Sequence, residues 1–335
     1  MTYNADLTLI WAGLIAFAVF AYVVLDGFDL GIGILFPMLG NDADRDTAMN
    51  SVAPVWDGNE TWLILGGGGM LAAFPLAYAI LMPAVYAPLI AMLLGLVFRG
   101  VAFEYRWRTQ RGRWAWDLAF CGGSILAAFS QGVILGAILQ GVTVTGRGYG
   151  GGWWDWLTPF SLLTGASVVA GYGMLGATWL IMKTADGLLA RAFHLAWWFG
   201  AATVVAIGAV SAATPFLKAD YWRRWLTFPN ISATAQVPLL VAIAAVALFF
   251  CLRRKNETWP FPIALGLFAL GYAGLAISLY PDIVPGRVTI WQASAPASSL
   301  GFMLIGAGVL IPIILAYTGY AYWVFRGKTD PKGYH

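Results

Sequence analysis

Charged residues are scarce in this chain, because Asp, Glu, Lys and Arg together make up only 10% of its 335 residues. A soluble globular domain has roughly 25% charged residues. Here 60% of the residues are hydrophobic and the mean hydropathy is +0.74. The composition cannot supply a water-soluble surface, which excludes a cytosolic enzyme, a nucleic-acid-binding protein and a disordered chain. The sequence therefore predicts a multispanning membrane protein.

Histidine and cysteine are also scarce, with two of each: His194, His335, Cys121 and Cys251. A chain that holds several hemes or a metal centre needs more axial ligands than this. No Cys/His spacing resembles a zinc or iron–sulfur site. We therefore expect His194 to be an interfacial helix residue and both cysteines to be reduced packing residues. Any redox cofactor is expected to be bound mainly by another protein.

Nine apolar segments account for most of the chain. They are residues 8–38, 56–75, 77–103, 114–140, 159–182, 192–214, 234–252, 261–280 and 295–325. A spanning helix takes about 20 residues, so the loops are short and no extramembrane domain fits. The sequence predicts an all-α integral membrane protein with nine transmembrane helices, folded as a single membrane domain over residues 1–335.

The loop cations predict the orientation of the chain. With the N-terminus outside, 13 of the 19 Lys and Arg residues lie in cytoplasmic segments and five lie outside. The remaining cation, Arg99, falls within the third apolar segment. Because cytoplasmic loops carry the excess of Lys and Arg, the N-terminus is expected outside and the C-terminus inside.

Two pairs of carboxylates fall on adjacent predicted helices. Asp26 and Asp29 are three residues apart and share a helix face, as do Asp57 and Glu60 beside Trp56. An ionisable group inside a bilayer costs at least about 2.5–3.5 kcal/mol, so it usually lines a polar path or finds a partner. Neighbouring carboxylates can also share a proton near neutrality. These acids are candidates for proton handling, and the alternative is that they cap helices at the interface.

Arg99 lies near the cytoplasmic end of the third segment. Its guanidinium either reaches the membrane interface or pairs with Glu104 or Asp57. Glu104 and Asp117 flank the third loop, where they can also pair with its arginines.

Several short stretches carry a family resemblance. They are Asp26-Gly27-Phe28-Asp29, residues 50–59 (NSVAPVWDGN), Phe98-Arg99-Gly100, Phe103-Glu104-Tyr105-Arg106, Pro312–Tyr317 and Tyr322-Trp323. Together these stretches resemble subunit II of the cytochrome bd-type quinol oxidases. The run Asn59-Glu60-Thr61-Trp62 and the short chain length are most similar to the cyanide-insensitive branch.

The resemblance implies a fold of two four-helix bundles, here residues 1–140 and 159–280, with a peripheral helix at 295–325. It implies a bacterial cytoplasmic-membrane complex that oxidises quinol and reduces dioxygen to water. Subunit I of the family carries two b-type hemes, heme d and the quinol site, and it is the obligate partner of subunit II. Subunit II binds no heme, although some members hold a structural quinone. A small single-span accessory subunit is a further partner compatible with the resemblance.

The resemblance also implies roles for particular acids. The acid of the family's Trp-Asp-Gly-Asn motif belongs to a proton path toward the hemes, and here it is Asp57 beside Trp56. Asp26 and Asp29 match positions on the same cytoplasmic side. Some members have Gln in place of Glu60, so a role for Glu60 is carried over less directly.

Two other functions remain open at this level. A proton-coupled secondary transporter also uses intramembrane acids, but these acids gather in the N-terminal half without a matching pair in the C-terminal half. A purely structural membrane subunit with interfacial acids is the third alternative.

Overall fold

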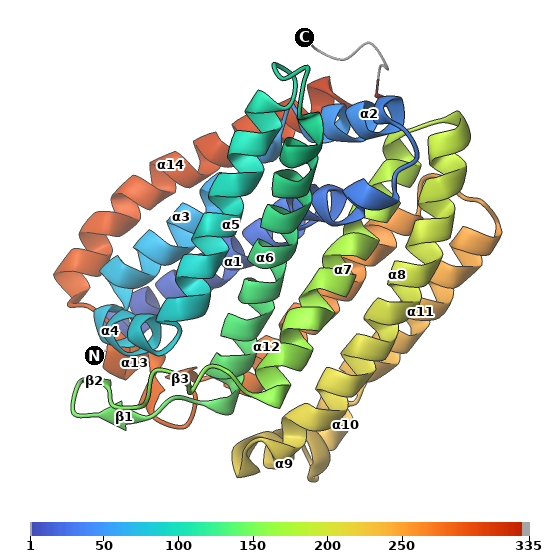
Figure 1. Ribbon diagram of the computed structural model, residues 1–335. Helices are drawn as coiled ribbons and strands as arrows, with labels where there is room; N and C mark the ends of the chain where they lie inside the picture. The colour runs from blue at the N-terminus through green and yellow to red at the C-terminus, as the bar shows by residue number, and fades with distance from the viewer. Residues whose placement is uncertain (1, 330–335) are drawn as a thin grey trace.

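The computed structural model describes residues 2–329, and side chains from residue 6 (Figure 1). The described part is dominated by nine long helices. They are α1 (Thr2–Leu35), α3 (Trp56–Ala73), α5 (Tyr86–Tyr105), α6 (Arg113–Gln140), α7 (Pro159–Lys183), α8 (Asp186–Ala213), α11 (Gln236–Arg253), α12 (Pro260–Leu279) and α14 (Ala297–Val324). All but α3 lie in segments that are long and apolar enough to span a membrane.

Short elements connect the long helices. They are η1 (Phe36–Met38), α2 (Asp42–Val52), α4 (Pro75–Ala84), η2 (Thr214–Phe216), α9 (Ala219–Leu226), α10 (Ile231–Thr234), α13 (Ile290–Ala293) and the hairpins β1 (Val144–Thr145)–β2 (Gly148–Tyr149) and β3 (Asp282–Val284)–β4 (Val288–Thr289). The hairpins lie at the end of the molecule where α1 begins, and α2 lies at the opposite end, where α14 finishes (Figure 1).

The long helices form the predicted arrangement. Helix α1 packs against α3 and α6, and α5 packs along α6. In the second group α7 packs along α8 and α12, and α11 joins α8 to α12. Helix α14 lies outside α1 and α3, with only 6% of its most apolar stretch buried. The all-α membrane fold is confirmed, whereas the exact limits of its bundles stay a prediction.

The prediction of one helix over residues 77–103 was wrong. The chain forms α4 and α5 there, separated at Val85. Pro88 lacks the N–H group that would bond the Ala84 carbonyl, which favours a helix boundary just before it. Helix α4 is a short, partly buried helix at the end of the molecule where α1 begins (Figure 1).

Glycines let helix backbones touch at the centre of the molecule. A Cβ atom built on Gly31 of α1 would overlap the Tyr172 carbonyl oxygen and lie 2.7 Å from the Gly176 nitrogen of α7. One built on Gly176 would lie 2.5 Å from the Gly31 carbonyl carbon. Such small-residue contacts are typical of helix association in membranes, and here they join the two bundles.

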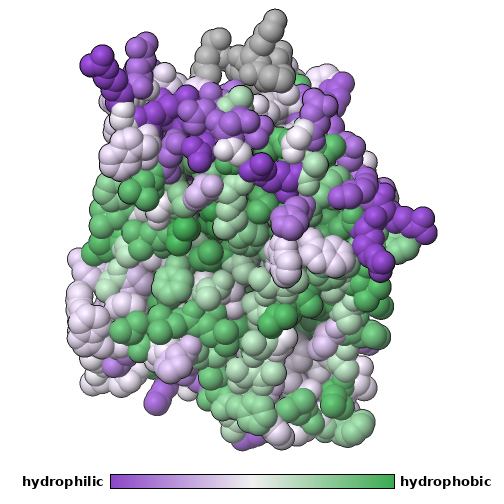
Figure 2. All heavy atoms as spheres, turned by 45° about the vertical axis from the view of Figure 1, so that its right-hand side comes forward, coloured by the Kyte–Doolittle hydropathy of each residue, from purple (hydrophilic) through white to green (hydrophobic). Residues whose placement is uncertain are grey.

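Hydrophilic residues gather at the α2 end, and apolar residues cover the sides below it (Figure 2). At this end Arg106 is fully buried and pairs with Asp46 of α2 and Asp117 of α6, each at 2.5 Å. Arg45 of α2 also reaches Asp117, at 3.3 Å. These ion pairs fix α2 across the beginning of α6. Asp117 thus pairs with an arginine of the third loop, as one alternative predicted.

Candidate functional site

The candidate site is a cluster of charged side chains between α1, α3 and α5. Arg99 donates to Asp26 Oδ1 over 2.5 Å from Nη1 and to Glu60 Oε2 over 2.8 Å from Nη2. The Arg99 and Asp26 side chains are 2% and 0% exposed, whereas that of Glu60 is 28% exposed. The cluster therefore has a buried core and a carboxyl group at its rim. We name Asp26, Arg99 and Glu60 the acid cluster.

Asp29 extends the acid cluster by one helical turn. Asn59 Nδ2 donates to Asp29 Oδ2 over 2.7 Å, and the Tyr322 hydroxyl donates to Asn59 Oδ1 over 2.9 Å. Asp29 is 2% exposed, and its Oδ1 has no hydrogen-bond partner among the described residues. The hydrogen bond from Tyr322 connects the peripheral helix α14 to the site.

Polar groups continue from the acid cluster into the second bundle. Tyr22 lies one turn before Asp26 on α1 and accepts a hydrogen bond from Gln131 Nε2 of α6 over 2.7 Å. The Tyr172 hydroxyl of α7 donates to Gln131 Oε1 over 2.6 Å. Tyr22, Gln131 and Tyr172 were absent from the sequence-based site. Gln131 offered a signal, since it is an amide in the middle part of an apolar segment.

The structure brings most of the predicted site residues together. Trp56 stacks on Phe103, with ring centroids 4.9 Å apart, and the Arg99 guanidinium lies 5.7 Å from the Trp56 ring. Asp57 is exposed in the first turn of α3, one turn from Glu60. It lies outside the buried core of the site.

Neither alternative for Arg99 holds, because its side chain is 2% exposed and pairs with Asp26 and Glu60 instead of reaching the interface or pairing with Glu104 or Asp57. Glu104 points to the surface and has no ion-pair partner among the described residues. Arg99 lies five residues before Glu104 on α5, and its side chain extends toward α1 and α3. Its guanidinium therefore meets Asp26 and Glu60.

The balance of charge defines what the site can do. Three carboxyl groups, those of Asp26, Asp29 and Glu60, lie around one guanidinium. Full ionisation would leave excess negative charge in a region of low dielectric, where charge is costly. A bound proton offsets part of that charge. Glu60, at 28% exposed, is the only one of the three carboxyl groups that is not buried.

His194 and the cysteines lie away from this site. His194 is exposed on α8, as expected for an interfacial residue. Cys121 and Cys251 are both free, which agrees with the expected reduced state.

The sequence of this chain is similar to those of bacterial oxidase subunits. The chain is 31% identical to cytochrome bd-I ubiquinol oxidase subunit 2 of Escherichia coli (strain K12), over 96% of this chain and 95% of that protein. It is 29% identical to cytochrome bd ubiquinol oxidase subunit 2 of Bacillus subtilis (strain 168), over 98% of both chains.

A solved structure of bd oxidase from Geobacillus thermodenitrificans has the same fold, with a TM-score of 0.77 and 18% identity. The match covers 96% of this chain and 99% of that chain. A family model described as cytochrome bd terminal oxidase subunit II matches residues 7–325. Because that match covers nearly the whole chain, the chain belongs to the cytochrome bd terminal oxidase subunit II family.

Proposed function

We propose that this chain is the heme-free subunit of a quinol:oxygen oxidoreductase in a bacterial cytoplasmic membrane. The named relatives from E. coli and B. subtilis are ubiquinol oxidase subunits of nearly the same length. Two b-type hemes, heme d and quinol would be held mainly by subunit I, and these groups supply the electron transfer to dioxygen. Exposed His194, facing the surface of α8, is poorly placed as a buried axial ligand, which supports the heme-free role.

The acid cluster would supply part of a proton path from the cytoplasm. In this proposal the α2 end of the molecule faces the cytoplasm, so the N-terminus is periplasmic and the C-terminus cytoplasmic. Asp57 lies at the entrance, and Glu60 takes up a proton there. The proton then passes to Asp26, whose Oδ1 and Glu60 Oε2 are bridged by the two terminal nitrogens of Arg99. The proposal rests on this Arg99 bridge, which joins a fully buried carboxyl group, that of Asp26, to a partly exposed one, that of Glu60.

Electrostatics would couple this path to the chemistry. Each electron that enters a low-dielectric membrane complex favours uptake of a compensating proton, because nearby charge is felt strongly there. Asp26, Asp29 and Glu60 can hold such a proton, and Arg99 limits how many they hold. The transporter alternative gains no support, since no described carboxyl group of α7, α8, α11 or α12 is buried.

The oxidase assignment is tested by purifying the tagged chain from its native membranes. We expect the reduced-minus-oxidised spectrum to show heme b and heme d bands, and a gel to show a larger partner. A pure chain without heme or partner that carries a proton-coupled flux would contradict the assignment.

The path predicts that Glu60→Gln slows dioxygen reduction while heme content stays intact. The amide keeps the shape and loses the titrating proton, so turnover should fall by roughly a hundredfold, the lower end of the range for positioned acid–base groups. Asp57→Asn should slow turnover less, because water can replace an exposed entrance group. Oxygen uptake per heme in the purified complex measures both effects.

Glu104→Gln is the matched control, because Glu104 is an exposed acid at the same end of the molecule with no ion pair in the described structure. We expect its turnover to equal that of the natural chain. Normal turnover in both Glu60→Gln and Asp26→Asn at full heme occupancy would exclude the relay and leave a structural role for the acids.

A further inference from the structure

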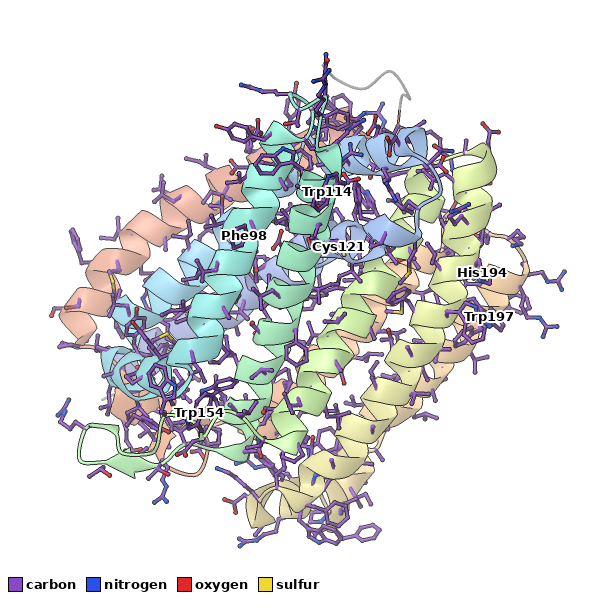
Figure 3. All side chains as sticks on the ribbon, in the orientation of Figure 1. Phe98, Trp114, Cys121, Trp154, His194 and Trp197 are labelled. Atoms are coloured by element: carbon purple, nitrogen blue, oxygen red, sulfur yellow. The ribbon has the colours of Figure 1, made fainter. Side chains whose placement is uncertain are left out.

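A pocket opens at the surface between α8 and α11, well away from the acid cluster. It has a volume of about 240 Å³ and is lined by Phe193, His194, Trp197, Leu252, Arg253 and Lys255. We name it the basic pocket. His194 and Trp197 lie on α8 in its half nearer the polar end (Figure 3). The pocket is thus at the level where the polar band gives way to the apolar sides.

The basic pocket carries uncompensated positive charge. Arg253 and Lys255 are exposed, and no carboxylate among the described side chains lies within ion-pair distance of either. The nearby Glu257 is engaged by Lys328 at 2.7 Å. The imidazole of His194 adds a hydrogen-bond donor on the facing helix. No described carboxylate therefore neutralises the positive charge of the basic pocket.

The end of α11 holds Lys255 in place. The Lys255 N–H bonds the Leu252 carbonyl and the Asn256 N–H bonds the Cys251 carbonyl, a helix end that favours glycine at position 255. Lys255 instead adopts a φ of 53° there. Its Nζ lies 4.7 Å from the Phe193 ring centroid. A lysine at this position fixes an ammonium group at the mouth of the pocket.

Apolar surface continues from the pocket along α11 toward the middle of the membrane. Trp197 packs edge-on against Phe249 at 4.9 Å and is 37% exposed, as expected for an aromatic residue at the headgroup level. Beyond it Phe250, Val246 and Ile243 are exposed on α11. The surface thus changes from cations to an interfacial indole and then to apolar side chains. This order matches that of a phospholipid's headgroup and acyl chains.

We propose that the basic pocket binds an anionic phospholipid, with its phosphate between Arg253, Lys255 and His194 and an acyl chain along α11. Basic pockets between membrane helices on the cytoplasmic side suit anionic headgroups. A zwitterionic lipid brings its own cation to the pocket and binds less well. The site contributes to neither heme binding nor the proton path.

The test uses the complete complex, purified in detergent, and a phosphatidylglycerol that carries a photoreactive diazirine near its headgroup. Cross-linked peptides are identified by mass spectrometry after titration with the probe. We expect adducts within residues 193–197 and 249–255. Each cation near an anionic lipid contributes on the order of a fivefold gain in binding, so Arg253→Gln with Lys255→Gln should weaken labelling by about 25-fold.

Lys255→Gly separates loss of charge from misfolding. Glycine suits the positive φ of this position, so the variant should fold at least as well while labelling falls about fivefold. Arg108→Gln with Arg111→Gln removes two exposed cations from the loop after α5 and should leave labelling unchanged. Equal labelling by a phosphatidylcholine probe, or labelling that survives loss of both pocket cations, would overturn the proposal. Competition by inorganic phosphate alone at equal concentration would also overturn it, because a free anion would then suffice.

Discussion

Arg99→Gln should greatly reduce the stability of the chain and of the complex that contains it. Arg99 is 2% exposed and is the cation that pairs with both Asp26 and Glu60. Removing one partner of a buried ion pair leaves an uncompensated charge and costs about 3–5 kcal/mol. We expect lower yield and faster thermal inactivation of the solubilised complex, measured as the half-life of intact complex on a sizing column.

Two further variants separate charge from shape. Arg99→Gln with Asp26→Asn removes both members of the most deeply buried pair, so its half-life should recover a large part of the loss. Arg99→Lys keeps the charge, but a single ammonium cannot reproduce the fork of the guanidinium, so it should be intermediate. Arg108→Gln, on the exposed loop, should have no effect. A half-life for Arg99→Gln equal to that of the natural chain would show that the buried carboxyl groups carry no charge that needs Arg99.

The presence of a polar site toward one end of the first helices could be predicted from sequence. Asp26 and Asp29 share one helix face by spacing alone, as do Asp57 and Glu60, and loop charge placed both pairs at the same end. The depth at which these side chains are buried, and the groups they pair with, could not be predicted in this way. They depend on the rotation of α3 and α5 about their axes, which the packing of α3 against α1 and of α5 against α6 sets.

Long-range hydrogen bonds were beyond sequence reasoning for the same reason. Asn59 bonds Asp29 on α1 and Tyr322 on α14, a residue 263 positions away. Nothing in the sequence around Asn59 or around Tyr322 specifies that contact. The helix boundary at Val85 is different, because Pro88 was visible and its missing N–H predicts a break. The continuous hydropathy of residues 77–103 masks this signal.

Gly31→Ala should separate the two bundles at their closest contact. A methyl group on Gly31 would overlap the Tyr172 carbonyl oxygen and meet the Gly176 nitrogen. Both are backbone atoms, so no side-chain rotation can make room and α1 must move away from α7. Overpacking of a tight interface typically costs about 1–3 kcal/mol and sometimes more. Because α1 carries Asp26 of the acid cluster, a shift of α1 should also lower turnover, measured as oxygen uptake per heme.

Gly208→Ala is the matched control, because Gly208 lies within α8 with nothing within 4 Å of its Cβ position. There alanine should be neutral or stabilising, since it is the better helix former. Gly176→Ala approaches the same contact from α7, where its methyl would lie 2.5 Å from the Gly31 carbonyl carbon. Once one methyl group has moved α1 and α7 apart, the second methyl group overlaps less with the opposite helix. The double variant should therefore lose less stability than the two single losses combined, whereas strictly additive losses would show that the two glycines do not share one contact.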